Sequence, residues 1–294
     1  MITISNYIYD FSEGISVTLL ESIFLGFIQG ITEFFPTSSS GHLSIFQRIL
    51  NLGYDSSEHL LFDVLLHLAT LVSVCLVYRR ELGAVIGDTF ELLSGRAGSD
   101  ETEGRMKPGA RLALLIVAAT LPLFVIVPFH SQIERLYTNI GFIAFALIMT
   151  GVLLYISAFF DDGRKTEKTA TVVDALIVGA AQAVATIPGV SRSGATITVG
   201  LSRGFRRSFA VRFSFLMSIP AVLGSVVVTL ISAFRTGIDW SLMPVYLVGM
   251  LVAGVVGYFA LSIMRRFITQ RPLTYFAYYC FGVGVIAIVL AFIT

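Results

Sequence analysis

Two short segments combine ionisable and hydroxyl side chains inside apolar stretches of the chain. The first segment runs from Gln29 to His42, and the second runs from Pro188 to Thr196. An ionisable group at membrane depth costs about 2.5–3.5 kcal/mol on insertion scales. Glu33, His42 and Arg192 therefore need one another or a ligand, and we expect the two segments to meet near the membrane interior.

Gln29 and Glu33 stand four residues apart, so a helix places them on one face. Two hard oxygen donors on one face suit Mg²⁺ or Ca²⁺, and oxygens of a substrate would complete the coordination shell. The alternative is a hydrogen-bonded pair in which Glu33 forms a salt bridge to Arg192. We predict a divalent cation held by Gln29 and Glu33.

Arg192 lies in the run Ser191-Arg192-Ser193-Gly194. Its planar guanidinium matches phosphate oxygens, and the helix that this run opens presents free N–H groups to an anion. The alternative is an ion pair with no ligand. We predict that Arg192 binds a phosphate group.

Ser39 and His42 supply a hydroxyl and an imidazole three residues apart. Histidine can exchange a proton near neutral pH, so His42 could serve the hydroxyl of Ser39, the best nucleophile candidate. The alternative for His42 is a structural role, while Ser38 and Ser40 either bind oxygen or cap the next helix.

The predicted catalytic residues are Glu33, Ser39, His42 and Arg192. The predicted substrate-binding residues are Ser38, Ser40, Ser191, Ser193 and Thr196. Asp63 and His67, also four residues apart, form a candidate supporting pair, and the alternative is a hydrogen bond between helices with no role in the site.

The composition predicts a single all-helical domain in a membrane, spanning residues 1–294. The chain is 55% hydrophobic and 13% charged, against about 25% charged residues in a soluble domain. Apolar runs near the roughly 20 residues that span a bilayer predict six transmembrane helices. These are residues 60–78, 110–128, 139–160, 213–233, 243–264 and 273–293. The net charge of +1 gives no indication of a nucleic-acid partner.

Two further apolar stretches, 15–50 and 171–202, are broken by the polar segments. Non-helical backbone at membrane depth survives only where protein or a wet cavity satisfies it, so each stretch is predicted to be a re-entrant helix-loop-helix pair. Most of the 20 Lys and Arg residues then fall on one side, in the loops 79–111, 161–170, 203–212 and 265–271. That side is predicted to be cytoplasmic.

The order of elements repeats once, which predicts two halves of inverted topology. Repeat one covers about 15–160 and repeat two about 171–294. A shift of 153 residues brings Gln29 onto Gln182 and Ser38 onto Ser191.

The two motifs resemble those of the undecaprenyl-pyrophosphate phosphatase, or bacitracin-resistance, family. The first is Gln29-Gly-Ile-Thr-Glu33 with Pro36-Thr-Ser-Ser-Ser-Gly-His42, and the second is Pro188-Gly-Val-Ser-Arg-Ser-Gly-Ala-Thr196. The similarity covers nearly the whole chain. Gln29 stands where many members have Glu, which weakens its case as an essential ligand, and His67 stands where members often have Gln.

The resemblance implies hydrolysis of undecaprenyl pyrophosphate to undecaprenyl phosphate and inorganic phosphate. It also implies a divalent cation, a bacterial cytoplasmic (inner) membrane location and a site open to the periplasm or exterior. By the same resemblance the active-site residues are Glu33, Ser39, His42, Ser191, Arg192 and Thr196.

Two other functions compete. A lipid-phosphate phosphatase of the vanadium-haloperoxidase type is disfavoured, because no histidine follows Arg192 at the required spacing and the Lys-x₆-Arg-Pro motif is absent. A transporter or flippase for the prenyl phosphate stays open, because inverted repeats with broken helices are a transporter architecture. A homodimer also stays open.

Overall fold

The structure, a computed structural model, describes residues 17–52, 57–94, 106–236 and 238–293. Within these ranges the chain is helical or in turns, and no named strand occurs. The first half contains α1 (Leu19–Thr32), α2 (Ser39–Ile49), α3 (Ser57–Val77), α4 (Arg79–Leu93), α5 (Pro108–Thr120), α6 (His130–Leu136) and α7 (Ile140–Ile156). The second half contains α8 (Val172–Val184), α9 (Arg192–Ser202), α10 (Arg207–Thr236), α11 (Met243–Gln270) and α12 (Thr274–Ile293). Short 3₁₀ turns η2 (Leu121–Val125), η3 (Val127–Phe129), η4 (Ser157–Phe159) and η5 (Trp240–Leu242) join or extend them.

Five helical segments are long and apolar enough to cross a membrane. They cover residues 108–136, 140–159, 207–235, 240–270 and 274–293. The predicted span at 60–78 is α3, which bends by 80° into α4 and raises the number of candidate spans to six. The prediction of an all-helical, polytopic membrane protein is confirmed.

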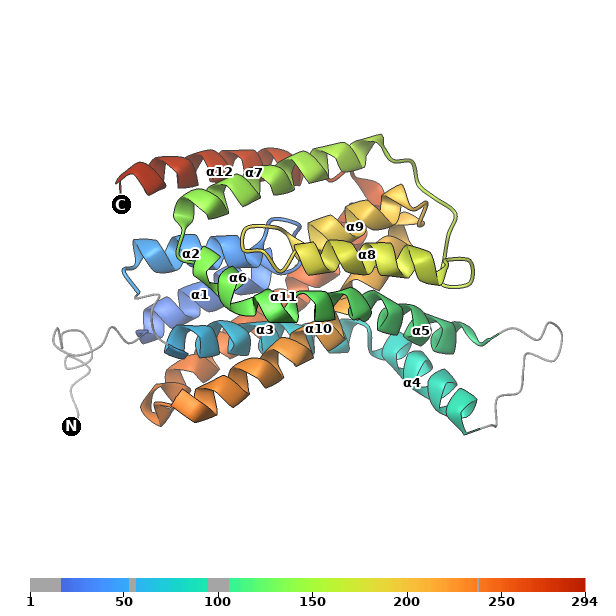
Figure 1. The fold of residues 1–294 in the computed structure, drawn as a ribbon, viewed down its shortest axis with the longest axis horizontal. Coiled ribbons are helices and arrows are strands. Elements are labelled where there is room, and N and C mark those ends of the chain that lie inside the picture. The colour runs from blue at the N-terminus through green and yellow to red at the C-terminus, as the bar shows by residue number, and fades with distance from the viewer. Residues whose placement is uncertain (1–16, 53–56, 95–105, 237, 294) are drawn as a thin grey trace.

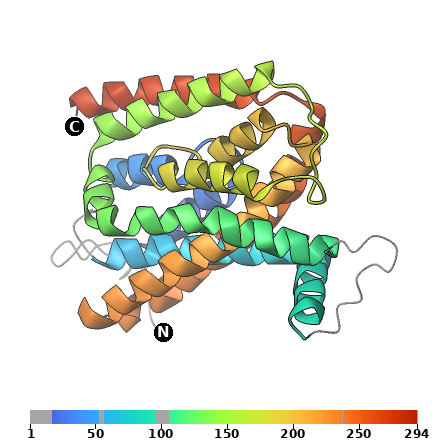
Figure 2. The same cartoon turned by 45° about the vertical axis from the view of Figure 1, so that its right-hand side comes forward.

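Helix α4 corrects the prediction of a loop over 79–111. Ile86, Phe90 and Leu93 stand at helical spacing, and all three side chains are exposed. One apolar stripe on a charged helix suits the surface of a bilayer, so the sequence favours a helix lying against lipid. Figures 1 and 2 show α4 pointing away from the bundle. Part of the predicted loop, 95–105, falls outside the described residues.

Both broken stretches form the predicted helix-loop-helix pairs. Each first helix starts with a capping box, Thr18 with Glu21 in α1 and Thr171 with Asp174 in α8. Such a box satisfies free N–H groups that begin a helix. Each second helix, α2 and α9, has 11 residues and a serine N-cap. The local structure therefore repeats along with the sequence.

Close glycine contacts set the positions of α1 and α8. A Cβ atom at Gly26 of α1 would lie 2.4 Å from the carbonyl oxygen of Gly249 in α11. A Cβ atom at Gly179 of α8 would lie 2.2 Å from the carbonyl oxygen of Ala119 in α5. Small residues allow this approach of helix backbones. Each broken pair thus packs on a helix of the other half. The inverted topology and the repeat boundaries stay predictions.

The remaining helices enclose these pairs. In Figure 1, α7 and α12 lie side by side along one edge of the bundle, and α3, α10 and α11 cross on the other side. The largest apolar core joins residues of α3, α5, α8, α9, α10, α11 and α12. The two polar loops consequently end inside a scaffold of apolar helices.

Candidate functional site

The two polar loops are in contact, as the sequence predicts. The backbone N–H of Gly189 donates to Ser40 Oγ over 3.4 Å, and a Cβ atom on Gly41 would lie 3.2 Å from the Cα of Gly189. Gly189 has a φ of +88°, a conformation that favours glycine. Thr150 of α7 fixes this loop, since its hydroxyl donates to the Gly189 carbonyl over 3.0 Å and accepts from the Ser191 N–H over 3.1 Å.

Glu33 is the centre of the site. It is buried at the end of α1, where it forms the C-cap. Its Oε2 accepts hydrogen bonds from Ser39 Oγ at 2.6 Å and from Gln29 Nε2 at 3.0 Å. Its Oε1 forms an ion pair with Arg192, the first residue of α9. One carboxylate therefore connects the two loops.

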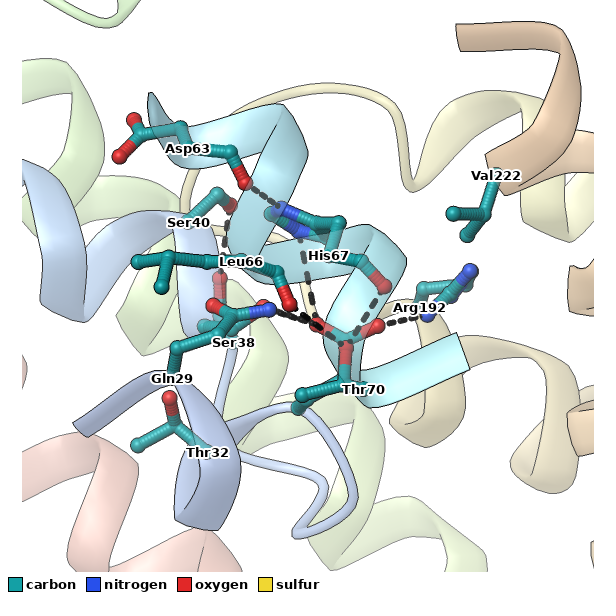
Figure 3. A network of polar contacts seen from close by, with 12 residues as sticks. Gln29, Thr32, Ser38, Ser40, Asp63, Leu66, His67, Thr70, Arg192 and Val222 are labelled. Carbon is teal, nitrogen blue, oxygen red and sulfur yellow. Dashed lines mark hydrogen bonds and ion pairs between the residues drawn. The ribbon is translucent and has the colours of Figure 1, made fainter. Parts of the chain in front are cut away.

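His67 of α3 is a fourth neighbour of this carboxylate, with its Nε2 at 3.5 Å from Glu33 Oε2. Its Nδ1 lies 2.8 Å from the backbone oxygen of Asp63. Because a carbonyl oxygen only accepts, Nδ1 carries a hydrogen, and Nε2 forms the ion pair with Glu33 when the ring carries its second proton. In Figure 3, Gln29, His67 and Arg192 point from α1, α3 and α9 toward the carboxylate at the centre of the cluster. The Asp63 carboxylate instead accepts from Gln47 Nε2 at 2.7 Å, so the predicted Asp63–His67 pair meets through the backbone.

His42 has different partners from the ones that its sequence position suggests. Its Nδ1 lies 2.7 Å from the Ser38 carbonyl oxygen, and its Nε2 lies 2.8 Å from the Tyr279 hydroxyl. The two rings are stacked with centroids 5.6 Å apart. In the neutral ring Nδ1 donates to the carbonyl, and Nε2 accepts from the tyrosine. In the described part of the chain, no hydrogen bond joins His42 to Ser39.

The other hydroxyl residues mainly shape the loops. Ser38 and Ser191 are N-caps, which accept from the N–H groups of Gly41 and Gly194 at 3.3 Å and 3.1 Å. Ser40 lies 3.3 Å from Ser38, and Ser193 lies 3.4 Å from Ser191, measured between hydroxyl oxygens. The Thr196 hydroxyl donates to the Arg192 carbonyl at 2.8 Å and lies 2.6 Å from that of Ser214. Ser38 and Ser191, two of the five predicted substrate-binding residues, therefore use their hydroxyl oxygens to cap helices.

The donors around Gln29 and Glu33 fit a hard divalent cation in part. Gln29 Oε1 is buried and has no hydrogen-bond partner among the described residues. An orphaned amide oxygen beside a carboxylate and the Ser39 hydroxyl is the oxygen-only donor set that Mg²⁺ or Ca²⁺ prefers. The described residues contain no group of three His, Cys, Asp or Glu side chains suited to a metal. A cation here would therefore need further oxygens from a substrate.

Several partners were not found from the sequence, namely Tyr279, Thr150, Gln47 and Ser214. Each contacts a predicted residue across helices, and Tyr279 lies 237 positions from His42. Helical spacing shows which residues share one face of a helix. It does not show which residues of a second helix pack against that face. The one sequence signal that these partners share is a polar group inside an apolar stretch.

An apolar cavity of about 770 Å³ adjoins the first loop. Thr32, Thr37 and Tyr279 line it, together with apolar residues of α11 and α12 and with Arg271. Because Thr32 precedes Glu33 and Tyr279 contacts His42, the cavity borders the polar cluster directly.

Comparison with known proteins shows the family to which the chain belongs. The family model described as bacitracin resistance protein BacA matches residues 22–286. A protein named undecaprenyl-diphosphatase from Carboxydothermus hydrogenoformans is 40% identical over 92% of this chain and 96% of its own length. Proteins of the same name from Rubrobacter xylanophilus and Methanobrevibacter smithii are 40% and 38% identical, over 90% and 91% of this chain and 96% of their own lengths. The match covers both polar loops and every helix that positions them, and the chain belongs to the bacitracin resistance protein BacA family.

Proposed function

We propose that this protein hydrolyses undecaprenyl pyrophosphate to undecaprenyl phosphate and inorganic phosphate, which recycles the lipid carrier for cell-wall polysaccharide synthesis. The observation that carries the proposal is the ion pair between buried Glu33 and half-buried Arg192, where two hydroxyl-rich loops meet. The names of the relatives support the same substrate.

Arg192 and Glu33 neutralise each other in the absence of a substrate. A pyrophosphate offers Arg192 oxygens in the geometry that its guanidinium matches, and the N–H groups at the start of α9 favour the same anion. Phosphoryl transfer depends mainly on positioning and on neutralising charge, which an arginine at the junction of the loops supplies. Arg192 therefore exchanges Glu33 for the phosphate, and this exchange frees the carboxylate for catalysis.

The hydrogen bond from Ser39 to Glu33 supports a nucleophilic role for this serine. Ser39 Oγ would attack the terminal phosphorus, its proton would pass to Glu33, and the bond to the bridging oxygen would break to release undecaprenyl phosphate. Water would then hydrolyse the phosphoserine. The alternative is a water molecule that Ser39 and Glu33 orient for direct attack. Acid-quenched protein examined by mass spectrometry separates the two, because only the first route leaves phosphate on the peptide containing Ser39.

We also propose that Gln29 and Glu33 hold a divalent cation together with the substrate. A Mg²⁺ or Ca²⁺ ion bound there would offset the negative charge of the pyrophosphate. Chelation should abolish turnover, and either ion should restore it. Glu33→Gln should reduce activity much more than Gln29→Ala, since it removes the carboxylate of the pair. Full turnover in excess chelator would refute the cation.

The isoprenoid chain needs apolar space next to the phosphate site. The cavity of about 770 Å³ beside Thr37 and Tyr279 offers it. Ile31→Trp, on the wall of this cavity, should raise KM for a long-chain substrate and leave a short-chain analogue unaffected. An equal change for both substrates would place the chain elsewhere.

The site is proposed to face the periplasm or exterior of a bacterial cytoplasmic membrane. Support comes from contacts that gather the basic segments around Arg203. Arg203 and Lys165 both pair with Asp174, and Arg111 and Arg212 both contact Glu167. With Cys75 and Cys280 replaced by alanine, an impermeant thiol reagent should label Thr138→Cys in intact cells and leave Ser202→Cys unlabelled. Both positions are exposed, and the opposite labelling would invert the topology. A homodimer stays a prediction that mass measurement in detergent tests.

The deciding assay is phosphate release from undecaprenyl pyrophosphate by the purified protein in detergent. A phosphatase releases inorganic phosphate without a membrane, whereas a transporter or flippase alone does not. Release that disappears in Glu33→Gln would support the proposal. Equal release by the variant would indicate a contaminating phosphatase.

A further inference from the structure

A second cavity, of about 380 Å³, lies at the basic end of the bundle. Residues from the junction of α3 and α4, the segment before α8, α10 and α11 line it. They are Tyr78, Glu81, Thr166, Glu167, Arg206, Ser208, Phe209, Val211, Arg212, Arg265 and Thr269. None of them belongs to the candidate catalytic cluster, so the cavity is a separate feature of the molecule.

Three arginines give this cavity its charge. Arg212 forms an ion pair with Glu167, and its guanidinium lies 5.7 Å from the ring centroid of Phe209. Arg265 lies over the ring of Tyr78, at 4.7 Å from the centroid. Arg206 and Arg265 have no carboxylate partner within the described ranges. Because only Glu81 and Glu167 offset the three arginines, the lining carries an excess of positive charge.

Arg212 gives a second and independent indication of a ligand. Its Nε is buried and has no hydrogen-bond partner among the described residues, whereas a buried donor normally has one. Tyr78 is 1% exposed, and its hydroxyl makes no hydrogen bond within the described ranges. Since both residues line the cavity, a molecule bound there would supply the missing partner. The stacked guanidinium of Arg265 holds a positive charge beside the Tyr78 ring.

The chemistry of the lining selects the ligand. Guanidinium groups and a hydroxyl donor together match the oxygens of a phosphate group. Basic pockets between transmembrane helices near the membrane surface bind the head groups of anionic lipids. We propose that this cavity binds a phosphate group, carried by an anionic lipid head group or by a free phosphate ion. The site is independent of the proposed hydrolysis.

The test compares two neighbouring arginines of α11. Arg265 lines the cavity, while Arg266 is equally exposed and does not line it, so Arg266→Gln is the matched control for Arg265→Gln. The full chain would be reconstituted in nanodiscs of phosphatidylcholine with increasing phosphatidylglycerol, and bound lipid would be counted by native mass spectrometry. Losing one charge-assisted contact should weaken phosphatidylglycerol binding about tenfold in Arg265→Gln and leave Arg266→Gln near wild type.

Tyr78→Phe keeps the ring under Arg265 and removes only the hydroxyl, so it should also weaken binding, by a smaller factor. Inorganic phosphate added to the protein in detergent identifies the source. A thermal shift with phosphate that Arg265→Gln abolishes would assign a free phosphate ion, while selective retention of phosphatidylglycerol would assign the lipid. Equal lipid binding by Arg265→Gln and Arg266→Gln, with no response to phosphate, would overturn the site.

Discussion

The loop between α1 and α2 and the loop between α8 and α9 share one pattern of helix capping and differ in chemistry. Each follows a helix that starts with a capping box, and each ends in a serine N-cap and an 11-residue helix. A shift of 153 residues places Glu33 on Thr186 and Ser39 on Arg192. The first loop therefore carries the acid and the hydroxyl, and the second carries the positive charge.

This difference shows why neither half is complete alone. Glu33 needs a positive neighbour inside the bundle, and Arg192 from the other half provides it. The two loops meet, and the side chains that differ between them make the contact an asymmetric polar site. The glycines at the contact keep the backbones close, so a substrate would touch both halves at once.

The largest effect should come from the pair that joins the loops. Arg192→Lys keeps the charge and loses the guanidinium fork, so we expect the rate of hydrolysis to fall by roughly 10²–10³. The protein should still elute as a monodisperse species, because apolar helices hold the bundle. Steady-state phosphate release measures the change.

A double variant decides between phosphate binding and simple neutralisation. If Arg192 only neutralised Glu33, Arg192→Gln with Glu33→Gln would remove both charges and recover much of the activity. If Arg192 binds phosphate, the double variant stays inactive while it remains folded. A substantially active double variant would refute phosphate binding by Arg192.

A smaller effect is expected at His67, which approaches Glu33 from outside both loops. His67→Leu removes the imidazole that approaches the carboxylate at 3.5 Å, and we expect kcat to fall about tenfold, the size of effect that the loss of one contact with a charged group produces. His67→Gln keeps a donor of similar reach and should retain most activity. If His67 were only structural, both variants would lower thermal stability, and the glutamine would bring no recovery of kcat.

A third prediction tests whether the glycine contacts of the two halves are equivalent. Gly26→Ala and Gly179→Ala would each place a Cβ against a carbonyl oxygen of a neighbouring helix, and overpacking of this kind costs about 1–3 kcal/mol. Both variants should lower the Tm in detergent by similar amounts. Gly87→Ala in α4 is the control, because no atom lies within 4 Å of its added Cβ. A large loss at Gly26 with none at Gly179 would show that the halves pack by different rules.

Much of this arrangement was predictable from local patterns. The helix breaks, the serine caps and the meeting of the loops follow from short motifs and from the cost of isolated charges in a membrane. Partners across helices were not predictable. His42 was expected to serve Ser39 three residues away, yet Tyr279 from the last helix contacts its ring. Helix α4 was missed because its single apolar stripe, Ile86, Phe90 and Leu93, is too sparse for a membrane span.

The smallest predicted effect concerns Gln29 and its counterpart Gln182. Gln29 donates to Glu33, whereas both polar side-chain atoms of the buried Gln182 lack a partner among the described residues. An unsatisfied buried amide costs about 1–3 kcal/mol, so an apolar side chain of similar volume should be tolerated or stabilising. Gln182→Met should therefore raise the Tm by a few degrees and leave hydrolysis unchanged. Gln29→Met should lower hydrolysis, since it removes the neighbour of the carboxylate. If Gln182→Met instead lowers both stability and activity, Gln182 has a polar function of its own. The acid, hydroxyl and positive charge of the two loops would then not account for the whole site.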